Sequence, residues 1–144
     1  MKKHYQAFLA ILCTTLCIMT SCSSENDPSV TDSGSIYRVV VEVSGNSPKG
    51  NLHLYNLDGV AFRNEQTGER TEQVNESFTS RTSYVTDGKV SKITAQGILY
   101  SKEDAKLTMN VYKDGETVFS QSKQLTTAVP GTDTTIDLVY STVK

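Results

Sequence analysis

His53 is the one side chain after residue 22 that could act as a general base near neutral pH. It stands between Leu52 and Leu54, at a position that the alternating pattern assigns to the polar side of a short strand. A hydrolytic triad or a zinc site needs several such groups to converge. This region has no second histidine, no cysteine beyond Cys22 and no nucleophile-elbow motif. We therefore expect a protein that is not an enzyme and has no metal centre.

Acidic side chains could provide a second kind of chemistry, the binding of Ca²⁺ through carboxylate oxygens. The candidates are a neighbouring pair and four loop acids: Glu103, Asp104, Asp58, Asp87, Asp114 and Asp133. Most of the loop acids stand directly before a glycine, which is typical of tight turns, and their spacing does not match an EF-hand. Glycine-rich phosphate-binding motifs are also absent from the sequence. We expect no cofactor.

Surface side chains could instead bind a partner. Tyr55 and Tyr112 fall on the polar parity of their strands or near strand ends, where an aromatic ring can stack on a sugar or anchor a protein. Arg63 and Arg70 belong to a nearly all-polar stretch from Arg63 to Ser77, which is either an exposed hairpin or a long surface loop. We take these four residues as the candidate interface.

Thr134 is a candidate site of covalent modification. The run Asp133-Thr134-Thr135 resembles the acceptor of O-glycosylation in envelope proteins of the Bacteroidota. A turn that leads into the last strand explains the same three residues, and it is the favoured interpretation.

The N-terminal residues indicate export and lipidation. Lys2 and Lys3 precede an apolar run from Ala7 to Met19, which has the length of a signal-peptide core and is too short to span a bilayer as a helix. The run ends in Met19-Thr20-Ser21-Cys22, which resembles the lipobox of bacterial lipoproteins. We expect residues 1–21 to be a lipoprotein signal peptide and Cys22 to be lipidated. An ordinary secreted protein is the alternative.

Residues 22–35 are predicted to form a flexible tether. They are rich in Ser, Asp, Pro and Gly, so they cannot bury enough apolar surface to offset their ordering entropy. The whole chain carries a formal charge of −2 without a basic block, which excludes a typical nucleic-acid binder. The expected location is the bacterial outer membrane, on its periplasmic or cell-surface side, with the membrane contacted through the lipid anchor.

The sequence predicts that these residues are positioned by β-strands. After Ser35 the apolar residues alternate, beginning with Tyr37, Val39, Val41 and Val43, and turn signals recur about every ten residues. We expect residues 36–144 to form an all-β domain of seven to nine strands. Its architecture should be an antiparallel two-sheet sandwich, Ig-like, or a small barrel.

Two Asp-Gly pairs predict hairpins. A type I′ turn at Asp87-Gly88 would pair the flanking runs and place the Phe78 ring over Gly97, unless Gly97 marks a bulge. Asp114-Gly115 predicts a second hairpin, either with a two-residue turn that pairs Val111 with Val118 or with a bulged loop that pairs Met109 with Phe119.

Three features together resemble a group of small Bacteroidota lipoproteins of unknown function. They are the lipobox with its acidic, Ser-rich tether, the run Val90-Ser91-Lys92-Ile93-Thr94-Ala95-Gln96-Gly97, and the run Val111-Tyr112-Lys113-Asp114-Gly115. The resemblance implies a sandwich or barrel fold and provides no catalytic residue to carry over.

Two functions fit these observations. The first is a membrane-anchored envelope lipoprotein that acts as a non-catalytic binding module for a protein or glycan. The alternative is an inhibitor or immunity-type lipoprotein that neutralises a secreted hydrolase or toxin, with the stretch from Arg63 to Ser77 as its inserted loop.

Overall fold

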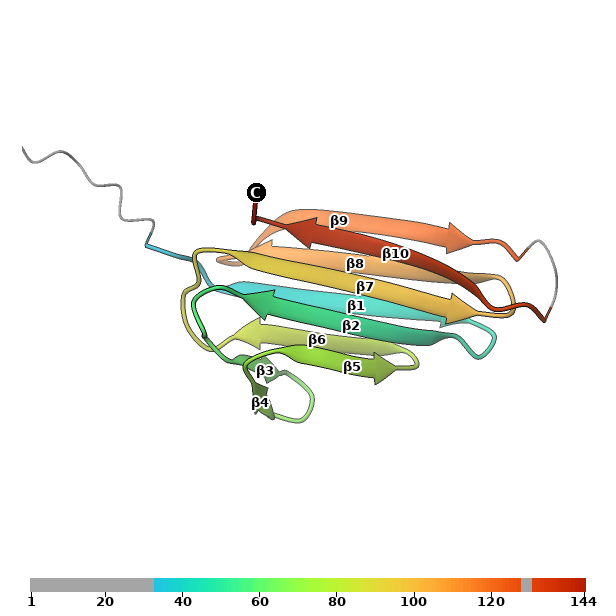
Figure 1. Ribbon diagram of the computed structural model, residues 1–144, viewed down its shortest axis with the longest axis horizontal. Helices are drawn as coiled ribbons and strands as arrows, with labels where there is room; N and C mark the ends of the chain where they lie inside the picture. The colour runs from blue at the N-terminus through green and yellow to red at the C-terminus, as the bar shows by residue number, and fades with distance from the viewer. Residues whose placement is uncertain (1–32, 128–130) are drawn as a thin grey trace, which may run out of the picture. The chain divides into compact units, whose positions relative to one another are not determined.

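The part of the chain that the structure describes contains ten strands (Figure 1). The computed structural model describes residues 33–127 and 131–144. The predicted signal peptide, Cys22 and most of the tether lie outside the described residues. The strands are β1 (Tyr37–Gly45), β2 (Lys49–Asn56), β3 (Phe62–Asn64), β4 (Arg70–Thr71), β5 (Val74–Phe78), β6 (Arg81–Thr86), β7 (Ile93–Ser101), β8 (Ala105–Lys113), β9 (Glu116–Leu125) and β10 (Thr134–Ser141).

The strands form two antiparallel sheets. One has six strands in the order β4-β3-β6-β1-β8-β9, and the other has four in the order β10-β7-β2-β5. The predicted sandwich is therefore confirmed, although it has ten strands instead of seven to nine. Within the described residues, no helix is long and apolar enough to cross a membrane.

The core lies between the two sheets and follows the period-two pattern. Tyr37, Val39 and Val41 on β1 are all at most 2% exposed, because successive side chains on a strand point to opposite faces. They pack with inward side chains of the other sheet, including Leu52 and Leu99. At the far edge, the rings of Phe119 on β9 and Tyr140 on β10 lie 5.7 Å apart and close the gap between the sheets.

The expected hairpin at Asp87-Gly88 is wrong. The turn exists, but it carries the chain from one sheet to the other: β6 pairs with β1 and β3, whereas β7 pairs with β2 and β10. Phe78 consequently lies over Gly50 on the neighbouring β2 and not over Gly97. Gly97 belongs to a regular part of β7 without a bulge and faces Val41 across the core.

The hairpin at Asp114-Gly115 is confirmed, with a register that neither prediction contained. Both turn residues have positive φ, 51° and 89°, as a type I′ turn requires. Lys113 pairs with Glu116 as in a two-residue turn, but a bulge then shifts the ladder so that Val111 pairs with Phe119. The extra residue on β9 keeps the Phe119 ring on the core side.

The polar stretch from Arg63 to Ser77 is neither a simple hairpin nor a loop. It supplies most of the β3–β4 hairpin at the edge of the six-stranded sheet and most of β5 at the edge of the four-stranded sheet. Both edges lie at the same side of the sandwich (Figure 1). The stretch therefore frames the opening between the two sheets.

Candidate binding site

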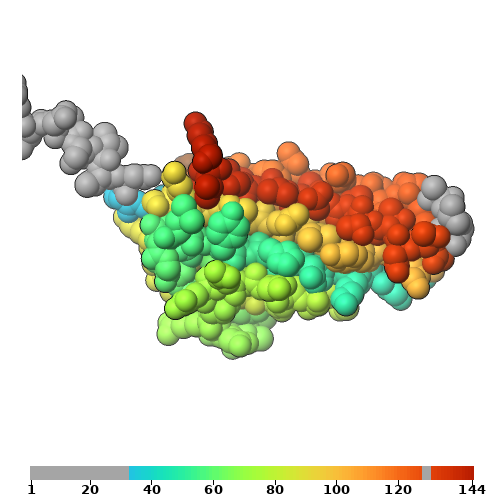
Figure 2. Space-filling view, in the orientation of Figure 1, coloured from blue at the N-terminus to red at the C-terminus, as the bar shows by residue number. Residues whose placement is uncertain are grey.

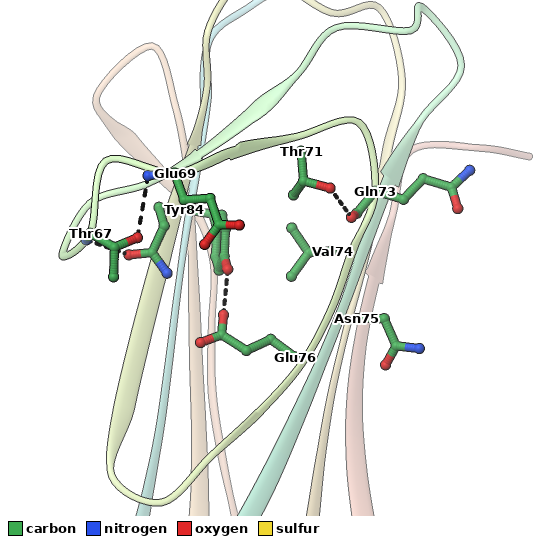
Figure 3. A pocket seen from close by; sticks show the side chains of 9 residues that line it. Thr67, Glu69, Thr71, Gln73, Val74, Asn75, Glu76 and Tyr84 are labelled. Atoms are coloured by element: carbon green, nitrogen blue, oxygen red, sulfur yellow. Dashed lines mark hydrogen bonds between the residues drawn. The ribbon is translucent and has the colours of Figure 1, made fainter.

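A polar pocket of about 300 Å³ lies at this opening (Figure 3). Its walls come from the β3–β4 hairpin, from β5 and from β6. The lining residues are Asn64, Thr67, Glu69, Thr71, Gln73, Val74, Asn75, Glu76 and Tyr84. All but Tyr84 belong to the stretch from Arg63 to Ser77, so the segment that the sequence singled out does form a site.

Glu76 and Tyr84 connect the two sheets inside the pocket. Glu76 occupies an inward position of β5, between the buried side chains of Val74 and Phe78. Its carboxylate accepts a short hydrogen bond from the Tyr84 hydroxyl group and a longer one, of 3.4 Å, from the hydroxyl group of Thr82. An acidic group is thereby held at the mouth of the core by donors from the opposite sheet.

The environment of Tyr84 keeps its phenol protonated. Burial, together with the hydrogen bond to Glu76 and the negative charges of Glu76 and Glu69, raises the pKa of Tyr84 to about 12. Figure 3 shows the Glu69 and Glu76 carboxylates directed toward the Tyr84 hydroxyl group, while Gln73 and Asn75 extend away from it. The pocket therefore presents the side-chain oxygens of Glu69 and Glu76 beside the protonated hydroxyl group of Tyr84.

The hairpin that carries Glu69 is fixed by its own side chains. The Asn64 side-chain oxygen accepts hydrogen bonds from the backbone N–H groups of Gln66 (2.8 Å) and Thr67 (3.1 Å). The Thr67 hydroxyl group in turn accepts one from the N–H group of Glu69 at 3.2 Å. Gly68, with φ of 76°, allows the turn between them. These bonds set the backbone position of Glu69 before any ligand arrives.

The four predicted interface residues lie outside this pocket. Arg63 and Arg70 point to the outer face of the six-stranded sheet, where both pair with Asp87. Tyr112 lies on the same outer face, with the Arg38 guanidinium 5.5 Å from its ring centre. Tyr55, 42% exposed, belongs to β2 of the other sheet, whose outer face is the one seen in Figure 2. Three of the four residues therefore share a face, and Tyr55 does not.

His53 and Thr134 take ordinary places in their strands. His53 is half-buried on β2, paired with Asn75 on one side and Gln96 on the other. Thr134 begins β10, and its hydroxyl group lies 3.5 Å from the Thr132 carbonyl oxygen. Its modification stays a prediction.

The acids considered for Ca²⁺ serve separate turns. Asp58 accepts hydrogen bonds from the backbone N–H and hydroxyl groups of Ser91, which lower the pKa of the Asp58 carboxyl group. Asp104 accepts one from the N–H group of Thr127 at 2.9 Å, and Asp87 binds Arg63. Among residues 33–127 and 131–144, no three His, Cys, Asp or Glu side chains are grouped so as to hold a metal ion.

Sequence reasoning missed Glu76 and Tyr84 as partners. The sequence does single out Glu76, because Val74, Glu76 and Phe78 alternate along one strand and should share its inner face. An acidic residue between two apolar ones on that face is unusual. Its pairing with Tyr84 was hidden, because the two residues lie on strands of different sheets.

No protein-family model matches the chain, and no curated protein matches it. Solved structures with a similar fold include a domain of unknown function, DUF4425, from Bacteroides vulgatus, with 20% identity and a TM-score of 0.65 over 78% of this chain and 98% of that one. A DUF4425 family protein from Bacteroides ovatus has 23% identity and a TM-score of 0.61 over 77% of this chain and 98% of its own.

A third similar structure is the calcium-bound form of a protein from Parabacteroides distasonis, with 21% identity and a TM-score of 0.59 over 74% of this chain and 92% of that one. At these identities the likeness shows the fold alone. The sandwich fold and the DUF4425 neighbours from the Bacteroidota agree with one part of the resemblance drawn from the sequence, a domain of unknown function in this phylum, whereas lipidation stays a prediction.

Proposed function

We propose that the protein is a lipid-anchored envelope lipoprotein that binds a glycan, without catalysis, through the pocket between the β3–β4 hairpin and β5. The anchor rests on the sequence around Cys22, which favours the outer membrane. The ligand site rests on one observation: a pocket at the open edge of the sandwich is lined almost entirely by polar side chains.

The lining determines the class of ligand. Pockets that bind drug-like molecules are mostly apolar and measure about 300–1,000 Å³. This pocket is at the small end of that range and offers Glu69, Glu76 and the Tyr84 hydroxyl group as hydrogen-bonding partners. The two oxygens of a carboxylate can each accept a hydrogen bond, so one carboxylate can bind two neighbouring hydroxyl groups of a sugar. A terminal sugar unit of a glycan therefore fits this pocket better than an apolar molecule does.

Glycan-array screening of the purified protein, followed by calorimetry with the best glycan, tests the proposal. Glu69→Gln and Glu76→Gln keep the shape of each side chain and remove its charge. Each should weaken binding roughly ten- to hundredfold, since hydrogen bonds to charged groups contribute about 1.5–3 kcal/mol.

Glu116→Gln is the matched control, because Glu116 is exposed at the start of β9, on the opposite edge of its sheet. It should bind like the wild type. Failure to bind any glycan, or equal binding by all three variants, would contradict the proposal.

Calcium binding is a second candidate, favoured by the calcium-bound form of the neighbour from Parabacteroides distasonis. Glu69 and Glu76 line one pocket, but Ca²⁺ takes six to eight oxygen ligands, so most of them would be hydroxyl groups or water. A site with only two carboxylates should be weak, with a Kd of about 0.1–1 mM. Calorimetry with CaCl₂ should then show binding that Glu69→Gln and Glu76→Gln both abolish and Glu116→Gln preserves.

A further inference from the structure

Arginines gather on one surface of the molecule. The chain has four, Arg38, Arg63, Arg70 and Arg81, and all four lie on outward positions of the six-stranded sheet. The ladder places Arg70 beside Arg63, Arg63 beside Val85, Val85 beside Arg38, and Arg38 beside Tyr112. We call Arg70, Arg63, Arg38 and Tyr112 the arginine row. It crosses five strands, a span of about 19 Å at the usual spacing between strands.

Two carboxylates hold the row in place. The Asp87 carboxylate accepts a hydrogen bond from Nε–H of Arg63 at 3.0 Å and lies 2.5 Å from Nε of Arg70. The Glu65 carboxylate accepts a hydrogen bond from Nε–H of Arg38 at 2.8 Å. The Asp87 side chain is 22% exposed, whereas those of Arg63 and Arg70 are 44% and 68% exposed. The acid therefore lies beneath the guanidinium groups, which face the solvent.

The row carries an excess of positive charge in a chain whose formal charge is −2. Its three guanidinium groups meet two carboxylates, Asp87 and Glu65. Like charges on directly opposite strand positions, as at Arg63 and Arg70, are destabilising, and exposed ion pairs return only about 0–1 kcal/mol. Placing these arginines side by side therefore adds little to the free energy of folding. A preorganised row of guanidinium groups is, however, well placed to bind anions.

We propose that the arginine row binds an anionic polysaccharide whose acidic groups are carboxylates or sulfates. The three arginines lie along one line across the sheet, with Val85 between Arg63 and Arg38, and such a line of cations matches a polymer that repeats its charge. The neighbouring side chains are hydrophilic: Thr108 bonds to Ser122 at 2.8 Å, and Asn110 bonds to Ser120 at 2.7 Å. A surface of this composition offers hydrogen bonds to the hydroxyl groups of a sugar chain.

This surface is separate from the pocket. Arg63 and Arg70 project from the outer side of the β3–β4 hairpin, whereas Asn64 of the same hairpin is buried and lines the pocket with Glu69. The two sites differ in charge as well, because the pocket presents carboxylates and the row presents guanidinium groups. The inference therefore stands whether or not the pocket binds a glycan.

Affinity electrophoresis of the purified protein tests the inference with heparin as the sulfated probe, polygalacturonate as the carboxylated probe and dextran as the neutral one. The wild type should be retarded by at least one acidic polymer and not by dextran, and added salt should weaken the effect. Comparison of the two acidic polymers identifies the acidic group that is preferred.

Paired variants distinguish binding by the arginine row from a general effect of net charge. Arg70→Gln should weaken binding about tenfold, a typical effect of losing one charged contact, whereas Arg81→Gln should change it less than about twofold. Arg81 is the matched control, because it is exposed and ion-paired on the same face, with Glu42, but lies outside the row. Arg70→Lys keeps the charge and loses the fork of donors, so it should bind with intermediate affinity.

Three outcomes would overturn the inference: binding to neither acidic polymer, equal losses in Arg70→Gln and Arg81→Gln, or retention by polyglutamate as strong as by the polysaccharides. The last result would identify an acidic peptide as the ligand class. Glu69→Gln should leave polymer binding unchanged, so failure of the pocket and failure of the row give different results.

Discussion

Tyr84 shows how a single phenol can serve both the core and a site. The residue is 7% exposed, its ring belongs to the apolar cluster between the sheets, and its hydroxyl group donates a hydrogen bond to Glu76 at the pocket. Burying a polar group costs free energy unless it finds a partner, and the partner here is a carboxylate. The hydrogen bond fixes the rotamer of Glu76 and so sets the position of a charge that the pocket offers to a ligand.

The raised pKa of Tyr84 predicts a loss of stability in alkali. The pKa rises from its ordinary value of 10.0 to about 12 in the folded protein, first because of burial and then because of Glu76. The folded state therefore favours the protonated phenol. This contribution is fully present below the unfolded pKa and is lost as the pH rises from about 10 to about 12.

Urea unfolding at about pH 9 and about pH 11 measures this effect. The free energy of unfolding should fall more steeply between these pH values in the wild type than in Tyr84→Phe, which has no phenol at this position. Lysines and the other tyrosines titrate in both proteins, so the difference between the two slopes isolates Tyr84. Equal slopes would show that the Tyr84 phenol does not resist ionisation.

At the scale of elements, local turn chemistry predicted where the chain turns but not which strands pair. Asp114-Gly115 joins neighbouring strands of one sheet, and Asp87-Gly88 joins strands of different sheets. Both have the same residue types and the same alternating flanks. Only the competition among strands for partners across the whole domain distinguishes them, because β6 finds β1 and β3 while β7 finds β2 and β10.

For the candidate sites too, local sequence was enough to select the segments but not to predict which residues meet. The polar composition of the stretch from Arg63 to Ser77 was enough to select it, and the alternation around Tyr37 and Val41 was enough to predict a buried strand. The convergence of Arg63 and Tyr112 on one face required the full ladder from β4 to β8. Long-range register of this kind depends on contacts that no local pattern records.

Gly50 supports the contact between β2 and β5, which predicts the cost of adding a methyl group there. A Cβ atom at Gly50 would lie 2.4 Å from the Phe78 ring, well inside van der Waals contact. Gly50→Ala should reduce the free energy of unfolding by about 1–3 kcal/mol, measured by urea denaturation, because the ring must move within a packed core.

Gly88→Ala is the matched control, because its nearest neighbour, a methyl carbon of Val60, would lie at an ordinary 3.4 Å. This change should alter stability by less than about 0.5 kcal/mol. If Gly50→Ala fails to fold, Phe78→Leu in the same chain should restore folding by opening space. Equal stabilities of Gly50→Ala and Gly88→Ala would show that the Phe78 ring does not rest on Gly50.

At the scale of the whole molecule, one short hairpin separates two surfaces of opposite charge. The β3–β4 hairpin directs Glu69 to the pocket and directs Arg63 and Arg70 to the outer face. This arrangement follows from the alternation of side chains along a strand, which gives each strand of a sandwich one inner and one outer set. The same few residues of backbone thereby carry two surfaces of different chemistry.

We expect the anchoring of this domain to depend on Cys22, so replacing this residue should release or mis-sort the protein. A single acyl chain gives only marginal membrane binding, so stable attachment requires the several chains that a bacterial lipoprotein carries at its N-terminal cysteine. Metabolic labelling with a radioactive fatty acid should mark the wild type and leave Cys22→Ala unmarked. Cell fractionation should then find the variant outside the membrane fraction or retained in the wrong membrane.

Cys17→Ala provides the control for this experiment, because Cys17, like Cys13, lies within the apolar run of the predicted signal peptide. It should be labelled like the wild type, since Cys22 alone is the predicted site of lipid attachment. N-terminal analysis of the mature wild type should find Cys22 blocked or lipidated at the first position. An unlabelled wild type that begins at Ser23, or at any residue before Cys22, would show that the chain is exported by an ordinary signal peptide and is not a lipoprotein.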